Sequence, residues 1–208
     1  MIKNYIFDFG QVIVKFDTEY MTSVYVKEEE NIKLVEQVVF DRLYWDRLDA
    51  GTITDTQVKE AICSRLPEYL HKNALAVYDN WYRNLPFVEG MKELLIKIKK
   101  KGGRLFLLSN ISIGFAENYK SVPEIKEIFN LFDGLVFSGP IGLIKPERKI
   151  FEYLLNKYDL KKEECVFIDD NIANIAGAQK VGLKAYQFNG NVDELKVYYK
   201  NESEWDFL

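Results

Sequence analysis

The chain has 208 residues, of which 48% are hydrophobic, and this length is enough to bury one full core and a small additional module. Its 28 Lys and Arg residues against 32 Asp and Glu residues give a net charge of −4, which offers no electrostatic support for binding nucleic acid or an anionic membrane. No apolar run approaches the roughly 18 residues of a membrane span, and no secretory leader pattern opens the sequence. We therefore expect a cytoplasmic protein with a small-molecule partner.

The first predicted element is a short apolar strand, "NYIF", at residues 4–7. It ends directly before Asp8, and Gly10 follows two residues later. An acid after a strand is often a helix cap. A glycine at this place, however, lets the chain turn sharply and brings its backbone close to a ligand. The stretch is therefore a candidate ligand site.

A helical module is predicted for residues 17–85, because charged and aromatic residues recur there at helical spacing without any alternating strand pattern. One helix face is expected to run through residues 35–43. Thr54 and Gln57 have the spacing of a capping box that begins a second helix. A third helix is expected at residues 74–83.

From Pro86 onward, amphipathic helices alternate with short apolar strands. The strands are "RLFLLSN", "GLVFS", "ECVFIDD" and "KAYQF", and glycines or prolines bound the helices between them. This alternation predicts an α/β fold with a doubly wound parallel sheet. Residues 1–16 and 86–208 would form this core domain, and residues 17–85 would be an inserted helical cap domain.

The carboxyl ends of the predicted strands carry polar side chains that are chemically complementary. Ligands of open parallel sheets bind at this edge, because the chain leaves the core there. Each of these residues alone is more often a cap or a turn. Together they place an acid, a hydroxyl, an amide, a cation and an acidic pair around one crevice: Asp8, Ser109, Asn110, Lys145, Asp169 and Asp170.

With these motifs the chain resembles the haloacid dehalogenase-like (HAD) hydrolases, over nearly its whole length. The resemblance lies in "FDFGQV" with Asp8, "LLSN" with Ser109, "IKPE" with Lys145, and the acidic motif "IDDNIAN". Within the family it is most similar to bacterial phosphatases of α-D-glucose 1-phosphate, which carry Asp-x-Gly-Asn-Val; here Gln11 replaces the asparagine. The substrate stays open, because in this family the cap normally selects it.

The resemblance implies a Mg²⁺-dependent phosphatase that acts on a small phosphorylated metabolite, with sugar phosphates as candidates. Asp8 would be the nucleophile that forms an aspartyl-phosphate, and Lys145 would be its catalytic partner. A carboxylate that attacks an anionic phosphate needs a cation between them, and Mg²⁺ prefers oxygen ligands. The expected ligands are Asp8, the Gly10 carbonyl, Asp169 and Asp170.

The non-bridging phosphate oxygens need fixed hydrogen-bond donors. We predict that the Ser109 hydroxyl, the Asn110 amide and the Lys145 ammonium supply them, together with the main-chain amides of Phe9 and Gly10.

Gly10 is a departure from the family pattern, in which a second Asp stands two residues after the nucleophile and protonates the leaving group. General acid-base help is typically worth on the order of 10² to 10⁴ in rate. Three interpretations remain. The protein is a phosphatase whose leaving group needs little protonation, with the acid-base role passed to water or a cap residue. It is a HAD-type hydrolase of another bond, such as a dehalogenase. Or it is a non-catalytic binding module on the same fold.

Two aromatic and basic stretches stand out in the predicted cap. Trp81 and Tyr82 are expected in a helical core, as aromatic residues in helix bundles usually are. Trp45 and Arg47 lie in "LYWDRLDAGTI", which faces the core crevice in capped members of the family. We therefore predict that Trp45 and Arg47 contact the substrate.

Overall fold

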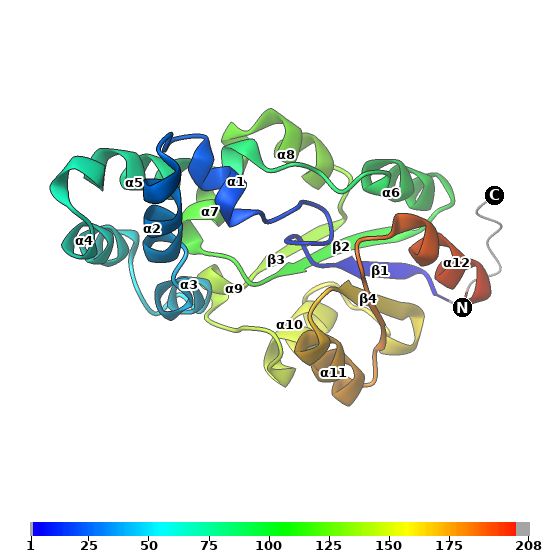
Figure 1. Cartoon of the computed structure of the whole chain (residues 1–208). Helices are drawn as coiled ribbons and strands as arrows, with labels where there is room; N and C mark the ends of the chain where they lie inside the picture. The colour runs from blue at the N-terminus through cyan, green and yellow to red at the C-terminus, as the bar shows by residue number, and fades with distance from the viewer. Residues whose placement is uncertain (1, 203–208) are drawn as a thin grey trace.

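Five parallel strands form a single sheet in the computed structural model, which describes residues 2–202 (Figure 1). The strand order is β3-β2-β1-β4-β5. These are the five strands expected from the sequence, and they confirm the α/β class. Their bounds are β1 (Asn4–Phe7), β2 (Arg104–Ser109), β3 (Gly134–Phe137), β4 (Cys165–Asp169) and β5 (Lys184–Gln187). Residues 203–208 of the predicted core domain lie outside the described part.

Helices cover both faces of the sheet (Figure 1). One face carries α6 (Met91–Lys100), α8 (Pro123–Phe129) and α12 (Val192–Glu202), and the other carries α10 (Arg148–Lys157) and α11 (Ile172–Val181). Four short elements complete this part of the chain: α7 (Ile113–Asn118), η2 (Tyr119–Ser121), α9 (Ser138–Ile141) and η3 (Lys162–Glu164). Within residues 2–202, no helix combines the length and apolarity that a membrane crossing requires.

The alternation of side chains along each strand builds the two layers. In β1, Tyr5 and Phe7 pack into the cluster under α6 and α8, and Ile6 packs into the cluster under α10 and α11. All three side chains are fully buried. Both faces of the strand are thus covered, as expected for a parallel sheet whose strands are continuous apolar runs.

The chain between β1 and α6 forms a separate group of helices with its own buried cluster. The capping box is confirmed: the Thr54 hydroxyl accepts the Gln57 N–H, and the Gln57 side chain accepts the Thr54 N–H. The elements are α1 (Thr18–Ser23), α2 (Glu29–Val39), α3 (Arg42–Asp49), α4 (Asp55–Arg65), α5 (Glu68–Asn80) and η1 (Trp81–Asn84). We call this group the helical cap.

Two helix predictions in the cap were wrong in detail. The face expected over residues 35–43 is split, because the Asp41 side chain accepts the Leu43 N–H and begins a new helix, α3. Leu43 is consequently 65% exposed. The third helix begins earlier than predicted, at Glu68, and continues as a 3₁₀ turn from Trp81.

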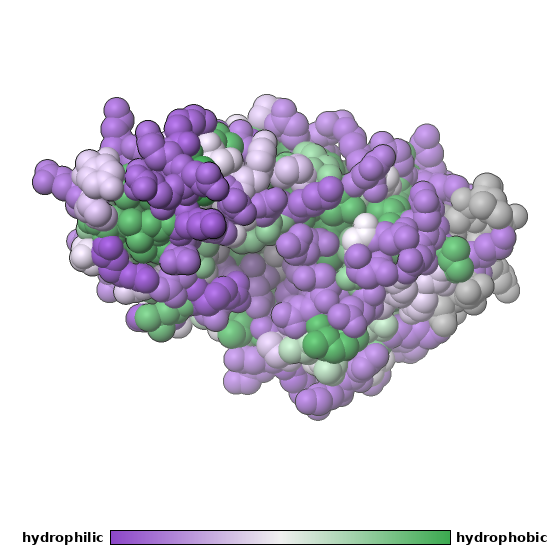
Figure 2. Space-filling model, in the orientation of Figure 1, coloured by the Kyte–Doolittle hydropathy of each residue, from purple (hydrophilic) through white to green (hydrophobic). Residues whose placement is uncertain are grey.

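Aromatic rings join the helical cap to the sheet domain. Trp45 lies 5.3 Å from Trp81 between ring centroids, and Trp81 stacks on Phe115 of α7 at 5.5 Å. Trp81 and Tyr82 are 7% and 8% exposed, so they are core residues as expected, but they pack in the cluster of the sheet domain and not in the cap's own cluster. The face of the molecule in Figure 2 is mostly hydrophilic and is hollowed where the cap meets the sheet domain.

A second contact fixes the end of α3 against α9. The Ser138 hydroxyl donates to the main-chain oxygen of Asp49 over 2.5 Å. Gly51 has a φ of +66°, and a Cβ built on it would lie 2.4 Å from the Gly139 oxygen. Position 51 therefore needs glycine for two reasons, its left-handed backbone and the close approach of the sheet domain.

We predict that Gly51→Ala destabilises the protein more than Gly102→Ala. Both glycines have positive φ, but a Cβ at Gly102 meets nothing within 4 Å. Left-handed strain should cost about 1 kcal/mol in each variant, and displacing the α3–α9 contact should add about 1 kcal/mol or more in Gly51→Ala. Urea unfolding measures both. Equal losses would mean that the close contact at Gly51 contributes nothing.

Candidate active site

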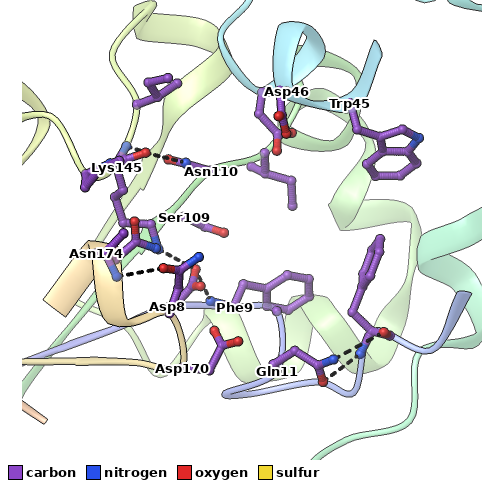
Figure 3. A pocket seen from close by; sticks show the side chains of 18 of the residues that line it. Asp8, Phe9, Gln11, Trp45, Asp46, Ser109, Asn110, Lys145, Asp170 and Asn174 are labelled. Carbon is purple, nitrogen blue, oxygen red and sulfur yellow. Dashed lines mark hydrogen bonds and ion pairs between the residues drawn. The ribbon is translucent and has the colours of Figure 1, made fainter. Parts of the chain in front are cut away.

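A cavity of about 420 Å³ lies at the carboxyl edge of the sheet, between the sheet domain and the helical cap. The strand ends and the loops that follow them contribute one side of its lining, and α3 and η1 contribute the other. In Figure 3, Trp45 and Asp46 of the cap lie across the cavity from Asp8 and Asp170. The structure thus brings the predicted strand-end residues to one place.

Asp8 follows β1 and is 9% exposed. Its Oδ1 accepts the Phe9 N–H over 2.7 Å and lies 2.8 Å from Lys145 Nζ. Within the described chain its Oδ2 makes no hydrogen bond. One oxygen is therefore held in place while the other is available. The Phe9 amide, predicted to hold phosphate, instead orients the Asp8 carboxylate.

Lys145 is the charge centre of the site. Its side chain is 1% exposed, and its Nζ lies 2.8 Å from Asp8 Oδ1 and 2.7 Å from Asp169 Oδ2. The Asn110 carboxamide donates to the Lys145 oxygen over 2.9 Å and accepts the Lys145 N–H over 2.8 Å. Both ends of the Asn110 side chain hold the Lys145 main chain, so the carboxamide that we predicted to donate to phosphate positions Lys145 in this structure.

Asp169 is fully buried at the end of β4. Its Oδ1 accepts the Asn171 N–H over 2.8 Å and the Asn174 carboxamide over 3.0 Å. Asn174 also donates to Oδ2 over 3.1 Å. Asp169 is thus fixed from three sides by Lys145, Asn171 and Asn174, and it anchors the ammonium that contacts Asp8.

Burial and charge shift the pKa values of this group in a consistent way. Burial raises the pKa of Asp8 to about 7, against the opposing effect of the Lys145 ammonium. Burial alone would lower the pKa of Lys145, but the charges of Asp8 and Asp169 outweigh it, so the pKa is raised. Burial and the nearby Asp169 also raise the pKa of Asp170. The cation stays charged, and the carboxylates crowd around it.

The carboxylates of Asp8, Asp169 and Asp170 fit a divalent cation. One oxygen from each lies within 4.8 Å of the others. Such crowding of acids raises the cost of ionising all three, and a hard cation with oxygen ligands would relieve it. Asp8 Oδ2 makes no hydrogen bond within residues 2–202, and the Asp170 carboxylate makes none with another side chain there, whereas the Asp169 carboxylate already binds Lys145, Asn171 and Asn174. Asp8 and Asp170 are therefore the freer ligands.

Ser109 and Gly10 face the same cavity. Ser109 is 3% exposed, and its hydroxyl points toward the cavity and makes no hydrogen bond within the described residues (Figure 3). Nothing lies within 4 Å of a Cβ built on Gly10. The position where the family pattern has a second acid is therefore empty space beside the Asp8 loop.

The sequence prediction for the cap needs one correction. Trp45 lines the cavity, while its indole N–H is donated to the Val39 oxygen over 2.5 Å. Arg47 is exposed and is not among the lining residues; Arg42 is. The reason is helical phase, since residues 42, 45, 46 and 49 share one face of α3 and residue 47 does not.

Gln11 has a structural role that the sequence analysis did not predict. Its φ is 56°, and its carboxamide donates to the Phe16 oxygen and accepts the Phe16 N–H, both over 3.3 Å. These bonds close the loop that carries Asp8 and Gly10. A polar residue directly after a glycine was the signal that could have suggested such a turn.

The sequence model of the haloacid dehalogenase-like hydrolases matches residues 2–182, and the chain belongs to this family of hydrolases. It is 25% identical over 205 residues to the D-ribitol-5-phosphate phosphatase of Bacteroides thetaiotaomicron, covering 93% of this chain and 95% of that protein. Against three other curated relatives the chain spans only 34% to 58% of their length.

Two solved structures show the same fold. A wild-type HAD family enzyme from Bacteroides thetaiotaomicron, in complex with magnesium and inorganic phosphate, has a TM-score of 0.67 and 22% identity, covering 92% of this chain and 96% of that one. The L-2-haloacid dehalogenase of Xanthobacter autotrophicus, with chloropropionic acid covalently bound, has a TM-score of 0.64 and 16% identity, covering 89% and 76%. The same fold thus binds magnesium and phosphate in one protein and chloropropionic acid in the other.

We predict that Lys145→Met destabilises the metal-free protein more at pH 8 than at pH 5. Burial already raises the pKa of Asp8, and without the opposing Lys145 ammonium this pKa rises further in the folded state, so the folded protein binds a proton more tightly than the unfolded chain. Its stability then falls as the pH rises. The loss at pH 8 should be about 3 kcal/mol, as for other broken buried ion pairs.

Urea unfolding in EDTA at both pH values measures this loss. Lys149→Met, which removes an exposed lysine nearby, is the matched control and should show neither loss. A loss in Lys145→Met that is equal at pH 5 and pH 8 would mean that Lys145 does not lower the pKa of Asp8.

Proposed function

We propose that the protein is a Mg²⁺-dependent phosphatase that hydrolyses a small phosphorylated metabolite through an aspartyl-phosphate on Asp8. The observation that supports this most strongly is the Asp8 carboxylate itself. One of its oxygens is held by Lys145 and the Phe9 amide, and the other is free at the cavity. A nucleophile needs this combination of fixed orientation and an open lone pair.

The residues of the chain suit the transfer of a phosphoryl group. Asp8 Oδ2 attacks phosphorus, and the bond to the leaving oxygen breaks with its electron pair passing to that oxygen. The Lys145 ammonium and the Ser109 hydroxyl are placed to stabilise the non-bridging oxygens without reorganising. Water then attacks the phosphorus of the aspartyl-phosphate, releases phosphate and restores the Asp8 carboxylate.

Asp8 and Asp170, with the Gly10 carbonyl, would bind Mg²⁺. Asp169 would act indirectly, because its bonds to Lys145, Asn171 and Asn174 fix the ammonium beside Asp8. When bound, the ion supplies the positive charge that lets an anionic nucleophile approach an anionic phosphate. The magnesium and phosphate in the related Bacteroides structure support this assignment.

The cavity volume of about 420 Å³ suits a small metabolite. We propose that residues 1–16 and 86–208 are the catalytic core domain and that residues 17–85 are a cap that selects the substrate. Arg42 and Trp45, rather than Arg47, are placed to contact the part of the substrate beyond the phosphate. Sugar or polyol phosphates fit this mixture of a cation and an aromatic edge, and the similarity to a ribitol-5-phosphate phosphatase supports them.

Two other functions of the fold are less well supported. A dehalogenase of this type needs no metal, and the group of Asp8, Asp169 and Asp170 would then crowd three acids around one ammonium without a second cation. A non-catalytic binding module would have no need for a carboxylate oxygen kept free of hydrogen bonds.

The test is a screen of sugar, polyol and triose phosphates, with p-nitrophenyl phosphate as a generic substrate, in Mg²⁺ and in EDTA. We expect phosphate release in Mg²⁺, loss in EDTA and recovery when Mg²⁺ is added back. Asp8→Asn should lower the rate at least about 10⁴-fold with an unchanged circular dichroism spectrum, because an amide is no nucleophile. Phosphate release that survives EDTA would contradict the Mg²⁺ dependence, and no activity on any phosphate would favour the dehalogenase or the binding module.

A further inference from the structure

The proposed reaction needs a proton at the leaving oxygen, and Gly10 cannot supply it. The cavity offers few other proton donors among the described residues. Asp8, Lys145 and Asp170 already have other parts in the reaction. Two more acids line the cavity, Asp46 and Asp49, both from α3 of the cap.

Asp46 is the weaker of the two candidates. It forms an ion pair with Arg42 one turn earlier in the same helix. The two side chains are 57% and 76% exposed, so the Asp46 carboxylate lies in water and is occupied by a guanidinium. It is an ion-paired surface group rather than an acid held free at the cavity.

Asp49 differs from Asp46 in each of these respects. It is partly buried, and its carboxyl group makes no hydrogen bond or ion pair with any residue in the described range 2–202. Burial raises the pKa of Asp49 to about 7; among the neighbouring charges, Arg42 and Lys145 oppose this rise, while Asp46 and Asp8 add to it. Asp49 lines the same cavity as Asp8 and Lys145, the reacting groups.

The position of Asp49 is fixed against the sheet domain. The Ser138 hydroxyl donates a hydrogen bond to the main-chain oxygen of Asp49. The same hydroxyl oxygen accepts the N–H of Ile111, just beyond the end of β2, over 2.9 Å. The close approach of Gly51 to Gly139 holds the next turn of chain. Asp49 is therefore a cap residue whose placement is set by the same strand end that carries Ser109.

We propose that Asp49 is the general acid-base residue that replaces the missing acid at Gly10. This inference rests on the proposed phosphatase function. As the bond from phosphorus to the leaving oxygen breaks, the Asp49 proton passes to that oxygen and the product leaves as an alcohol. The Asp49 carboxylate then takes a proton from the water that attacks the aspartyl-phosphate, so Asp49 ends the cycle protonated and Asp8 ends it free.

This assignment makes a specific prediction for substrates of different leaving-group basicity. A phenolate leaving group needs a proton, and p-nitrophenolate needs little help. Asp49→Asn should therefore lower kcat/KM for phenyl phosphate by about 10²-fold or more, within the usual range for a lost general acid, and lower that for p-nitrophenyl phosphate far less. Across a series of aryl phosphates, the dependence of log kcat/KM on leaving-group pKa should be shallow in the wild type and steep in Asp49→Asn.

The pH profile is the second readout. In the wild type, kcat/KM for phenyl phosphate should fall as the pH rises above about 7, because Asp49 then loses the proton that it must donate. This alkaline fall should be absent in Asp49→Asn. Asp46→Asn makes the same substitution one turn earlier in the same helix and should keep the wild-type slope and profile. Circular dichroism and thermal unfolding of each variant show that the fold is retained.

The outcomes separate the two claims. If the wild type hydrolyses none of the aryl phosphates in Mg²⁺, the proposed phosphatase function itself fails. If it hydrolyses them and Asp49→Asn lowers kcat/KM equally across the series, Asp49 only shapes the cavity and the inference is overturned. It is also overturned if Asp49→Asn keeps the wild-type slope and alkaline fall.

Discussion

The site depends on one interaction, the contact of the buried Lys145 ammonium with the carboxylates of Asp8 and Asp169 at 2.8 and 2.7 Å. An ammonium with 1% side-chain exposure is tolerated only because two acids compensate it. In turn, the positive charge of the ammonium offsets the repulsion between the two carboxylates, which lie close together. The asparagines at positions 110 and 174 serve this contact, one by holding the Lys145 main chain and the other by holding Asp169.

The sheet explains why these groups meet. β1 lies between β2 and β4 and is parallel to both. The residues that follow these three strands therefore emerge at the same edge of the sheet. This much could be predicted from the sequence, since each strand is a continuous apolar run that ends in a polar residue. The five strands, the capping box at Thr54 and the convergence of Asp8, Ser109, Lys145 and Asp169 all follow from such local patterns.

What could not be predicted depends on contacts between distant parts of the chain. Arg42 rather than Arg47 lines the cavity because Asp41 caps α3 and sets its phase. Asn110 supports Lys145 instead of a ligand because a loop from another strand passes within hydrogen-bond distance. Asp49 has no sequence signal of its own. Its raised pKa comes from burial between two parts of the chain, and no local pattern encodes that burial.

The central claim is that the free oxygen of Asp8 becomes covalently phosphorylated. Rapid acid quenching of a reaction with ³²P-labelled substrate, followed by peptide mapping, tests this most directly. We expect label on the peptide that contains Asp8, removal of this label by hydroxylamine, and no label in Asp8→Asn. Product formation in a single turnover without any protein-bound label, or label on another residue, would contradict it.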